Sequence, residues 1–190
     1  MPSHDFLALI GCALSLIGSV IYIRSILQGR TKPHFYSHLV WFIVLCVAFL
    51  AQVQAQAGPG MWITGAGALA ILTTTLLSLR YGEKNITRTD RIALVAALLA
   101  IVPWILTDDP FWSVIFVTAI DMVAYYPTLR KSWHKPHEEN LTMYAIGAVE
   151  FTLSLLALEQ HSVVTMLYPA ALIMANGLLI GLCLWRRKVA

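Results

Sequence analysis

Seven apolar segments follow one another along the chain, and they limit its fold more than any other feature. A helix that crosses a bilayer needs about 20 predominantly apolar residues. The segments that meet this need are roughly 5–23, 36–56, 61–80, 91–107, 110–129, 141–158 and 163–185. Charged residues make up only 12% of the chain, against about 25% in soluble domains. We therefore expect an all-α membrane protein with seven transmembrane helices.

The placement of charge predicts how these segments are oriented. All 13 Lys and Arg residues lie in the loops after the first, third and fifth segments, at the segment ends that border these loops, or in the C-terminal tail. The other loops and the N-terminal end carry acids instead, namely Asp5, Asp108, Asp109 and Glu159. The positive-inside rule then places the N-terminus outside and the C-terminus in the cytoplasm. We expect a multi-pass protein of a bacterial inner or plasma membrane, with the lipid bilayer and no nucleic acid as a partner.

The chain also carries a weak internal repeat. The stretches GRTKPHFYSHLVW (29–41) and SWHKPHEENLTMY (132–144) share a Lys-Pro-His that recurs 103 residues later. The same offset places the first three segments on the last three and leaves the fourth without a mate. Two units with an odd number of spans can run parallel only if one helix joins them. The repeat therefore predicts one three-helix unit in 1–80, a cytoplasmic loop with a linker helix in 81–109, and a second three-helix unit in 110–190.

This 3-1-3 arrangement resembles the SWEET and PQ-loop superfamily of small transporters, whose halves are parallel repeats. YYPTLRKSWHKPHEENL is similar to the proline-bearing end of a PQ-loop segment, with Thr128 where a glutamine is typical. The resemblance implies two parallel three-helix bundles, an inverting linker helix, a small-molecule solute at the midplane, and homo-oligomers as in SWEET relatives. It also implies that Pro127 is a hinge, that Asn176 and its repeat mate Thr73 bind the substrate, and that Trp62 stacks on it.

Two acids, Asp121 and Glu150, fall near the middle of the fifth and sixth segments. Helical rise places them about 16 and 14 Å from a segment end, in a hydrocarbon core about 30 Å thick. A charge at that depth is costly, and no Lys or Arg lies in the interior of a segment. We expect these acids to couple transport to protons or to hold a cationic group. A structural role, in which they share a proton or bond a hydroxyl such as that of Thr118, stays open.

One face of the second segment is predicted to line the cavity opposite these acids. Its members recur at helical spacing and are His38, Trp41, Leu45, Ala48 and Gln52. Trp41 and Gln52 are the substrate contacts that we expect from this face.

These patterns together predict a small-molecule transporter that works by alternating access, with a sugar, an amino acid or a nucleoside- or vitamin-like solute. The alternative is a pH-responsive membrane receptor or assembly factor on the same fold, which binds without transporting. Histidines titrate near physiological pH, and four of them are predicted on the cytoplasmic side: His34, His38, His134 and His137. Zinc could bind such a set, but no Cys accompanies it, so we expect no metal and no cofactor. No nucleophile–base pair is evident, and we expect no enzyme.

Overall fold

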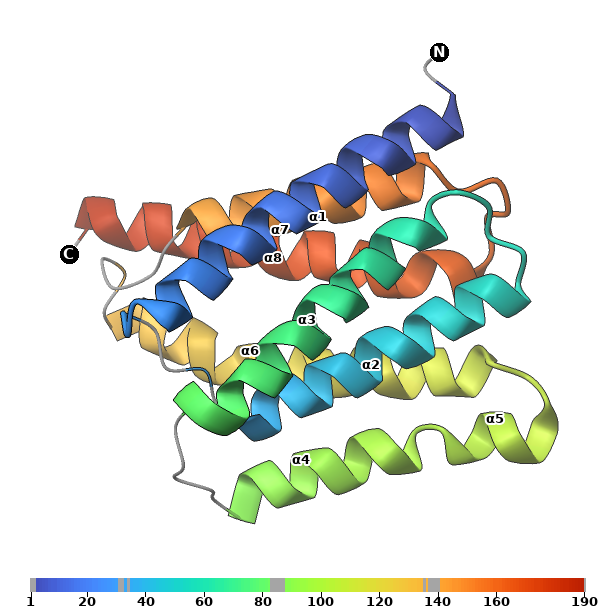
Figure 1. Ribbon diagram of the computed structural model, residues 1–190, viewed down its shortest axis with the longest axis horizontal. Coiled ribbons are helices and arrows are strands. Elements are labelled where there is room, and N and C mark those ends of the chain that lie inside the picture. Colours follow the sequence, from blue (N-terminus) through green and yellow to red (C-terminus); the bar gives the residue numbers. More distant parts are fainter. Residues whose placement is uncertain are drawn as a thin grey trace.

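The computed structural model describes residues 3–30, 33, 35–82, 88–134, 136 and 141–189, and these residues form eight α-helices. The helices run side by side along the longest axis of the molecule (Figure 1). Their bounds are α1 His4–Leu27, α2 Phe35–Gln54, α3 Met61–Tyr81, α4 Arg88–Leu99, α5 Val102–Thr107, α6 Phe111–His134, α7 Leu141–Leu156 and α8 Val163–Val189.

Several of the helices have the length and composition of membrane spans. Four of them, α1, α2, α3 and α8, are long and apolar enough to cross a bilayer. Shorter apolar helical stretches cover Leu94–Thr107, Phe111–Val123 and Tyr144–Leu156. The chain is therefore an all-α protein with the helices of a multi-pass integral membrane protein, and each predicted apolar segment falls on helical residues.

The fourth segment, predicted as one helix over 91–107, is instead two helices. Ala100 and Ile101 form a turn between α4 and α5. Proline has no N–H to donate, and its ring clashes with the carbonyl group four residues earlier. Pro103 therefore cannot continue α4, which ends at Leu99, but it fits the first turn of α5, where a free N–H is not needed.

The join between α5 and α6 is tight, and capping contacts close it. The Oδ1 atom of Asp109 accepts a hydrogen bond of 2.9 Å from the backbone N–H of Phe111, the first residue of α6. The carbonyl oxygen of Pro110 accepts the N–H of Val114 at 2.9 Å. Asp109 thus caps the helix, and Pro110 stands immediately before its first turn.

The helices pack as two equivalent sets of three. In the first set α3 contacts both α1 and α2, and in the second set α8 contacts both α6 and α7. Between the sets, α1 packs on α7 and α2 on α6, while α3 also touches α7 and α2 also touches α8. Exchanging α1, α2 and α3 for α6, α7 and α8 leaves this pattern unchanged. Such an exchange symmetry is what an internal repeat produces.

The core of the molecule is centred on α2, which contacts α3, α4, α6 and α8. Small side chains occupy many of the closest contacts: Ala48 and Ala51 of α2, Ala68 of α3 and Ala97 of α4 are all buried. Small residues let helix backbones approach closely, which favours packing where the solvent is lipid. The linker helices α4 and α5 pack against the outside of α2 and α6.

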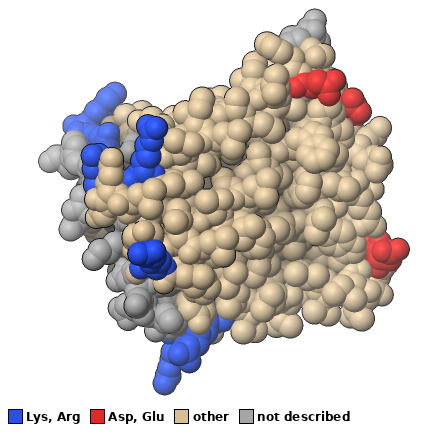
Figure 2. Space-filling view, in the orientation of Figure 1, with Lys and Arg blue, Asp and Glu red and all other residues tan. Residues whose placement is uncertain are grey.

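Charge separates along the long axis of the molecule. On the face shown in Figure 2, the described Lys and Arg residues gather at one end, and the Asp and Glu residues gather at the other. We call these the basic end, where α1, α3 and α8 finish with Arg24, Arg80 and Arg186, and the acidic end, with Asp5 and Glu159.

Candidate ligand cavity and buried polar pairs

A cavity of ≈ 470 Å³ lies between the first set of helices and α7 of the second set. Small-molecule sites commonly enclose about 300–1,000 Å³ within mostly apolar walls. This cavity has such walls, into which a few polar and aromatic groups are set. They are Ser15, Ser19 and Tyr22 of α1, His38 and Trp41 of α2, Thr64 and Thr74 of α3, and Tyr144, Glu150 and Phe151 of α7.

Two polar cavity residues, Thr64 and Glu150, lie at the same depth on opposite helices. The hydroxyl of Ser154 on α7 donates a 3.0 Å hydrogen bond to the carbonyl of Gly60, which precedes α3. Because α3 and α7 run in opposite directions, one turn inward from this contact leads to Thr64 on α3 and to Glu150 on α7. Each is displaced by about 6 Å along its helix. Both then face the same cavity.

Both groups also have unused hydrogen-bonding capacity. The Thr64 side chain is 1% exposed, and its hydroxyl has no hydrogen-bond partner in the described part of the chain. The Glu150 side chain is half-buried, and among the described residues its carboxyl group makes no hydrogen bond or ion pair. Buried polar groups are normally satisfied, so this pair is suited to a group that the protein itself does not provide.

Aromatic rings form the part of the cavity wall nearer the basic end. The rings of Tyr22 and His38 stack with centroids 5.9 Å apart and planes inclined by 17°. The Tyr22 hydroxyl lies 3.4 Å from Nε2 of His38. The Trp41 ring meets His38 edge-on at 5.4 Å. Tyr144 contributes a further ring from α7.

The second acid, Asp121, lies outside the cavity lining. Its Oδ2 atom accepts a hydrogen bond of 3.1 Å from the hydroxyl of Tyr168, and the two side chains are 4% and 3% exposed. A second pair joins the same two helices, where the Tyr125 hydroxyl donates to Oδ1 of Asn176 at 3.1 Å. The ring of Phe151, which lines the cavity, meets the Tyr168 ring edge-on at 6.0 Å.

These contacts decide between the two structural roles considered for the acids. The partner of Asp121 is the hydroxyl of Tyr168, so the acid does bond a hydroxyl. That hydroxyl is not the one of Thr118, which donates to the carbonyl of Val114 in its own helix at 2.6 Å. No contact between Asp121 and Glu150 is present among the described residues, so a shared proton has no structural support.

Of the predicted substrate contacts, Trp41 lines the cavity, but Gln52 and Asn176 do not. Gln52 is buried near the acidic end of α2, and its Nε2 donates to the carbonyl of Thr165 at 3.0 Å. It therefore ties α2 to α8. Asn176 is buried behind the cavity wall, where its amide packs against Gly147 of α7.

Thr73 and Trp62, the other predicted contacts, face away from the cavity. Thr73 is exposed, and its hydroxyl donates to the carbonyl of Leu69 in the preceding turn at 2.9 Å. Its neighbour Thr74 lines the cavity instead, because one residue turns a helix by about 100°. Trp62 is 55% exposed, and its ring packs against Phe49.

The remaining predictions concern Pro127 and the histidines. Helix α6 continues through position 127 without a break, but the Pro127 side chain lies outside the described residues. His34 and His137 also lie outside them. His38 is buried in the cavity wall, and His134 is exposed at the end of α6. Over the described ranges, no group of three or more metal-binding side chains occurs.

Sequence reasoning did not predict Tyr22, Thr64, Tyr144 and Phe151 as cavity residues. The repeat could have indicated Tyr144, because it stands 103 residues after Trp41 and both residues line the cavity. Nothing in the sequence separates Thr64 from the other threonines of α3, since all of them lie in an apolar run.

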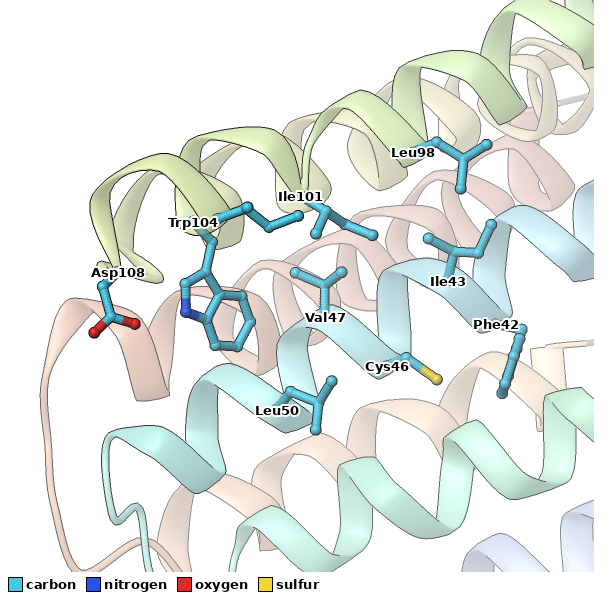
Figure 3. Close-up of a pocket in the computed structure, with 10 residues that line it drawn as sticks. Phe42, Ile43, Cys46, Val47, Leu50, Leu98, Ile101, Trp104 and Asp108 are labelled. Atoms are coloured by element: carbon cyan, nitrogen blue, oxygen red, sulfur yellow. The ribbon is translucent and has the colours of Figure 1, made fainter.

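A second hollow lies on the outer side of α2, where it faces α4 and α5. It measures ≈ 480 Å³ and is lined almost entirely by apolar side chains (Figure 3). Asp108 and the Trp104 ring nitrogen are the polar groups in this lining, and Figure 3 shows both at the α5 end. A groove of this composition can contact an apolar chain but offers little to a polar solute, so we take the first cavity as the candidate site.

Comparison of the chain with protein-family models, with curated proteins and with solved structures finds no match.

Proposed function

We propose that this protein is a small-molecule transporter of a bacterial inner or plasma membrane, on a SWEET-like fold, that works by alternating access. The observation that carries the proposal is the cavity between the two sets of helices, at mid-depth and lined from both. The exchange-symmetric packing supports it as well. Transporters built from repeats commonly bind substrate between them near the bilayer midplane and rock one unit against the other. The separated charges support an N-out, C-in orientation.

Hydrogen bonds at the acidic end would hold one conformation of such a cycle. The loops before α3 and after α7 are joined there by two backbone bonds, from Glu159 N–H to the Ala57 carbonyl at 2.8 Å and from Gly60 N–H to the Ala157 carbonyl at 2.9 Å. The Gln52 bond to α8 lies near the same end. Opening the cavity toward the acidic end would require these bonds to break. Helices α1–α3 would then move as a rigid body relative to α6–α8.

Within this proposal the two membrane-embedded acids have different roles. Glu150 faces the cavity and is the group placed to exchange a proton or to hold a cation. Asp121 bonds Tyr168 inside the second set of helices and would keep α6 and α8 together during the movement. Pro127 would be the flexible point of α6.

A cavity-filling substitution tests the proposal. A Cβ at Gly67 would have its nearest neighbour, a Leu45 methyl group, 3.9 Å away and would project beside the cavity. We expect Gly67→Leu to fill the cavity and to abolish solute uptake into proteoliposomes. Gly177→Leu is the matched control, because Gly177 is exposed and a Cβ there meets nothing within 4 Å. Equal uptake by both variants would refute the cavity as the transport site.

The same proteoliposomes separate the transporter from a receptor on the same fold. A panel of radiolabelled sugars, amino acids, nucleosides and vitamins is first screened for binding and then for flux. A transporter moves its ligand across the membrane, whereas a receptor binds the ligand and leaves the internal concentration unchanged.

A further inference from the structure

We propose that the cavity binds a protonated amine with an aromatic or aliphatic body, whose ammonium group lies between the Glu150 carboxylate and the Thr64 hydroxyl. The proposal that the amine binds rests on the cavity alone. The proposal that the amine is transported also rests on the transport function proposed above.

The ammonium end of the ligand is inferred from the two groups with unused hydrogen-bonding capacity, the Thr64 hydroxyl and the Glu150 carboxylate. Thr64 and Glu150 line one cavity from opposite helices, one turn inward from the same hydrogen bond between Ser154 and Gly60. The Thr64 hydroxyl is buried without a partner in the part of the chain that the structure describes. An ammonium group has three donors and no acceptor, so it can donate to a carboxylate and a hydroxyl together.

The charge of the ligand follows from what surrounds Glu150. The titratable groups that line the cavity with it are Tyr22, His38 and Tyr144, and Cys12 of α1 is near enough to interact with its charge. Among the described residues, no Lys or Arg lines the cavity. A carboxylate at this depth needs a cationic partner, and a cationic ligand would provide it.

The other ligand classes fit this lining less well. A hard metal ion takes about six to eight oxygen ligands, and the cavity has one carboxylate among aromatic walls. A sugar needs several free donors and acceptors, but two hydroxyls of the lining are already engaged within their own helices. Ser19 donates to the carbonyl of Ser15 at 2.7 Å, and Thr74 donates to that of Ile71 at 2.9 Å.

The body of the ligand follows from the aromatic part of the wall. Tyr144 stands six residues before Glu150 on α7, which is about 9 Å nearer the basic end. The rings of Tyr22, His38 and Trp41 line that part of the cavity from α1 and α2. A ligand with its ammonium group at Glu150 therefore extends an apolar body toward these rings, which favours an arylalkyl- or alkylammonium ion over a small one.

The test uses three probes and the purified full chain in nanodiscs. The probes are 2-phenylethylammonium, its neutral counterpart 2-phenylethanol, and methylammonium, which keeps the charge and lacks the body. By calorimetry we expect 2-phenylethylammonium to bind more tightly than either of the others. Failure of this cation to bind, or equal binding of the neutral alcohol, would overturn the proposal.

Substitutions then locate the ammonium end. Glu150→Gln is expected to weaken 2-phenylethylammonium binding by about 10- to 100-fold, the range for a charge-assisted hydrogen bond, and to leave 2-phenylethanol nearly unaffected. Asp5→Asn makes the same kind of change at an exposed position and should alter the affinity by no more than about twofold. Equal affinity of Glu150→Gln and wild type would refute the assignment.

A second residue keeps the test valid if Glu150→Gln does not fold. Thr64→Val removes the unpartnered hydroxyl and is expected to weaken 2-phenylethylammonium binding by about 2- to 10-fold. Thr152→Val is its control, because Thr152 is exposed on α7 and donates to the carbonyl of Ala148. The same effect for both valine variants would place the ammonium group elsewhere and refute the proposal.

Flux measurements distinguish failure of this proposal from failure of the transport function. If 2-phenylethylammonium binds in a Glu150-dependent way but does not enter proteoliposomes, the amine site is supported and the transport of this amine is refuted. A neutral solute could instead enter in a manner that Gly67→Leu blocks, while the amine neither binds nor competes with that solute. The transport function would then be supported and the amine site refuted.

Discussion

A single methyl group at position 60 is predicted to force α3 away from α7. Gly60 donates its N–H to the Ala157 carbonyl at 2.9 Å and accepts the Ser154 hydroxyl at 3.0 Å. A Cβ built on Gly60 would lie 2.9 Å from the backbone nitrogen of Leu158 and 3.0 Å from the carbonyl carbon of Ala157. It would lie closer still to the Ser154 carbonyl oxygen. All three are backbone atoms, which cannot rotate out of the way as a side chain can.

The expected cost of Gly60→Ala follows from these contacts. Loss of the two hydrogen bonds costs about 1 kcal/mol each, and overpacking adds about 1–3 kcal/mol. The helical geometry of Gly60, with φ −57° and ψ −27°, suits alanine. Alanine also reduces the conformational freedom of the unfolded chain, which stabilises the folded protein by about 0.4–1 kcal/mol. The net loss is about 2–5 kcal/mol. The Gly60–Ser154 contact also keeps Thr64 and Glu150 at the same depth. We therefore expect amine binding to weaken as well.

Thermal unfolding in detergent measures this cost. For a chain of this size, about 2–5 kcal/mol corresponds to a midpoint lower by about 4–20 °C. Gly177→Ala is the matched control, since a Cβ there meets nothing within 4 Å, and alanine should stabilise the helix by about 0.5–1 kcal/mol. The two variants should therefore shift the midpoint in opposite directions. A Gly60→Ala protein as stable as the wild type would refute the close approach of α3 and α7.

Three further predictions test other parts of the structure. In a double-mutant cycle, Asp121→Asn and Tyr168→Phe should show a coupling energy of about 0.6–1.7 kcal/mol in detergent unfolding, the range for hydrogen bonds between membrane helices. Additive effects would mean that the hydroxyl and the acid do not interact. Asp109→Ala should cost about 1 kcal/mol in the same assay through loss of the α6 cap, and Asp109→Asn should retain most of it. Single cysteines replacing Glu159 and Lys188 should be labelled by a membrane-impermeant thiol reagent from opposite sides, Glu159→Cys from outside; labelling of both from one side would contradict the orientation.

The sequence predicted the helices well because the constraint on them is local. A span must be apolar along its whole length, so 141–158 and 163–185 could be recognised without knowledge of their neighbours. Capping by Asp109 was also predictable, since its partner Phe111 is two residues away. The break in 91–107 was not predicted, although Pro103 marked it. A proline can either kink a helix or end it, and the sequence does not distinguish the two.

The cavity residues were predicted only in part, because in a membrane protein the faces toward lipid and toward other helices are both apolar. Helical periodicity placed His38, Trp41 and Gln52 on one face of α2, yet this face passes from the cavity at Trp41 to the contact with α8 at Gln52. Neighbouring residues on α3 likewise differ, since Thr73 is exposed and Thr74 lines the cavity.

By itself, then, the sequence determined the class of protein, the apolar segments, the ends that carry charge and the presence of two acids within apolar segments. Hydropathy, charge and helix capping act within a few residues, and they can be read from the chain directly. Only the tertiary structure separated the two acids, one bonded to Tyr168 and the other facing a cavity with Thr64. That distinction depends on which helices meet and at what depth. Contacts between residues far apart in the chain set that depth, such as the bond between Gly60 and Ser154.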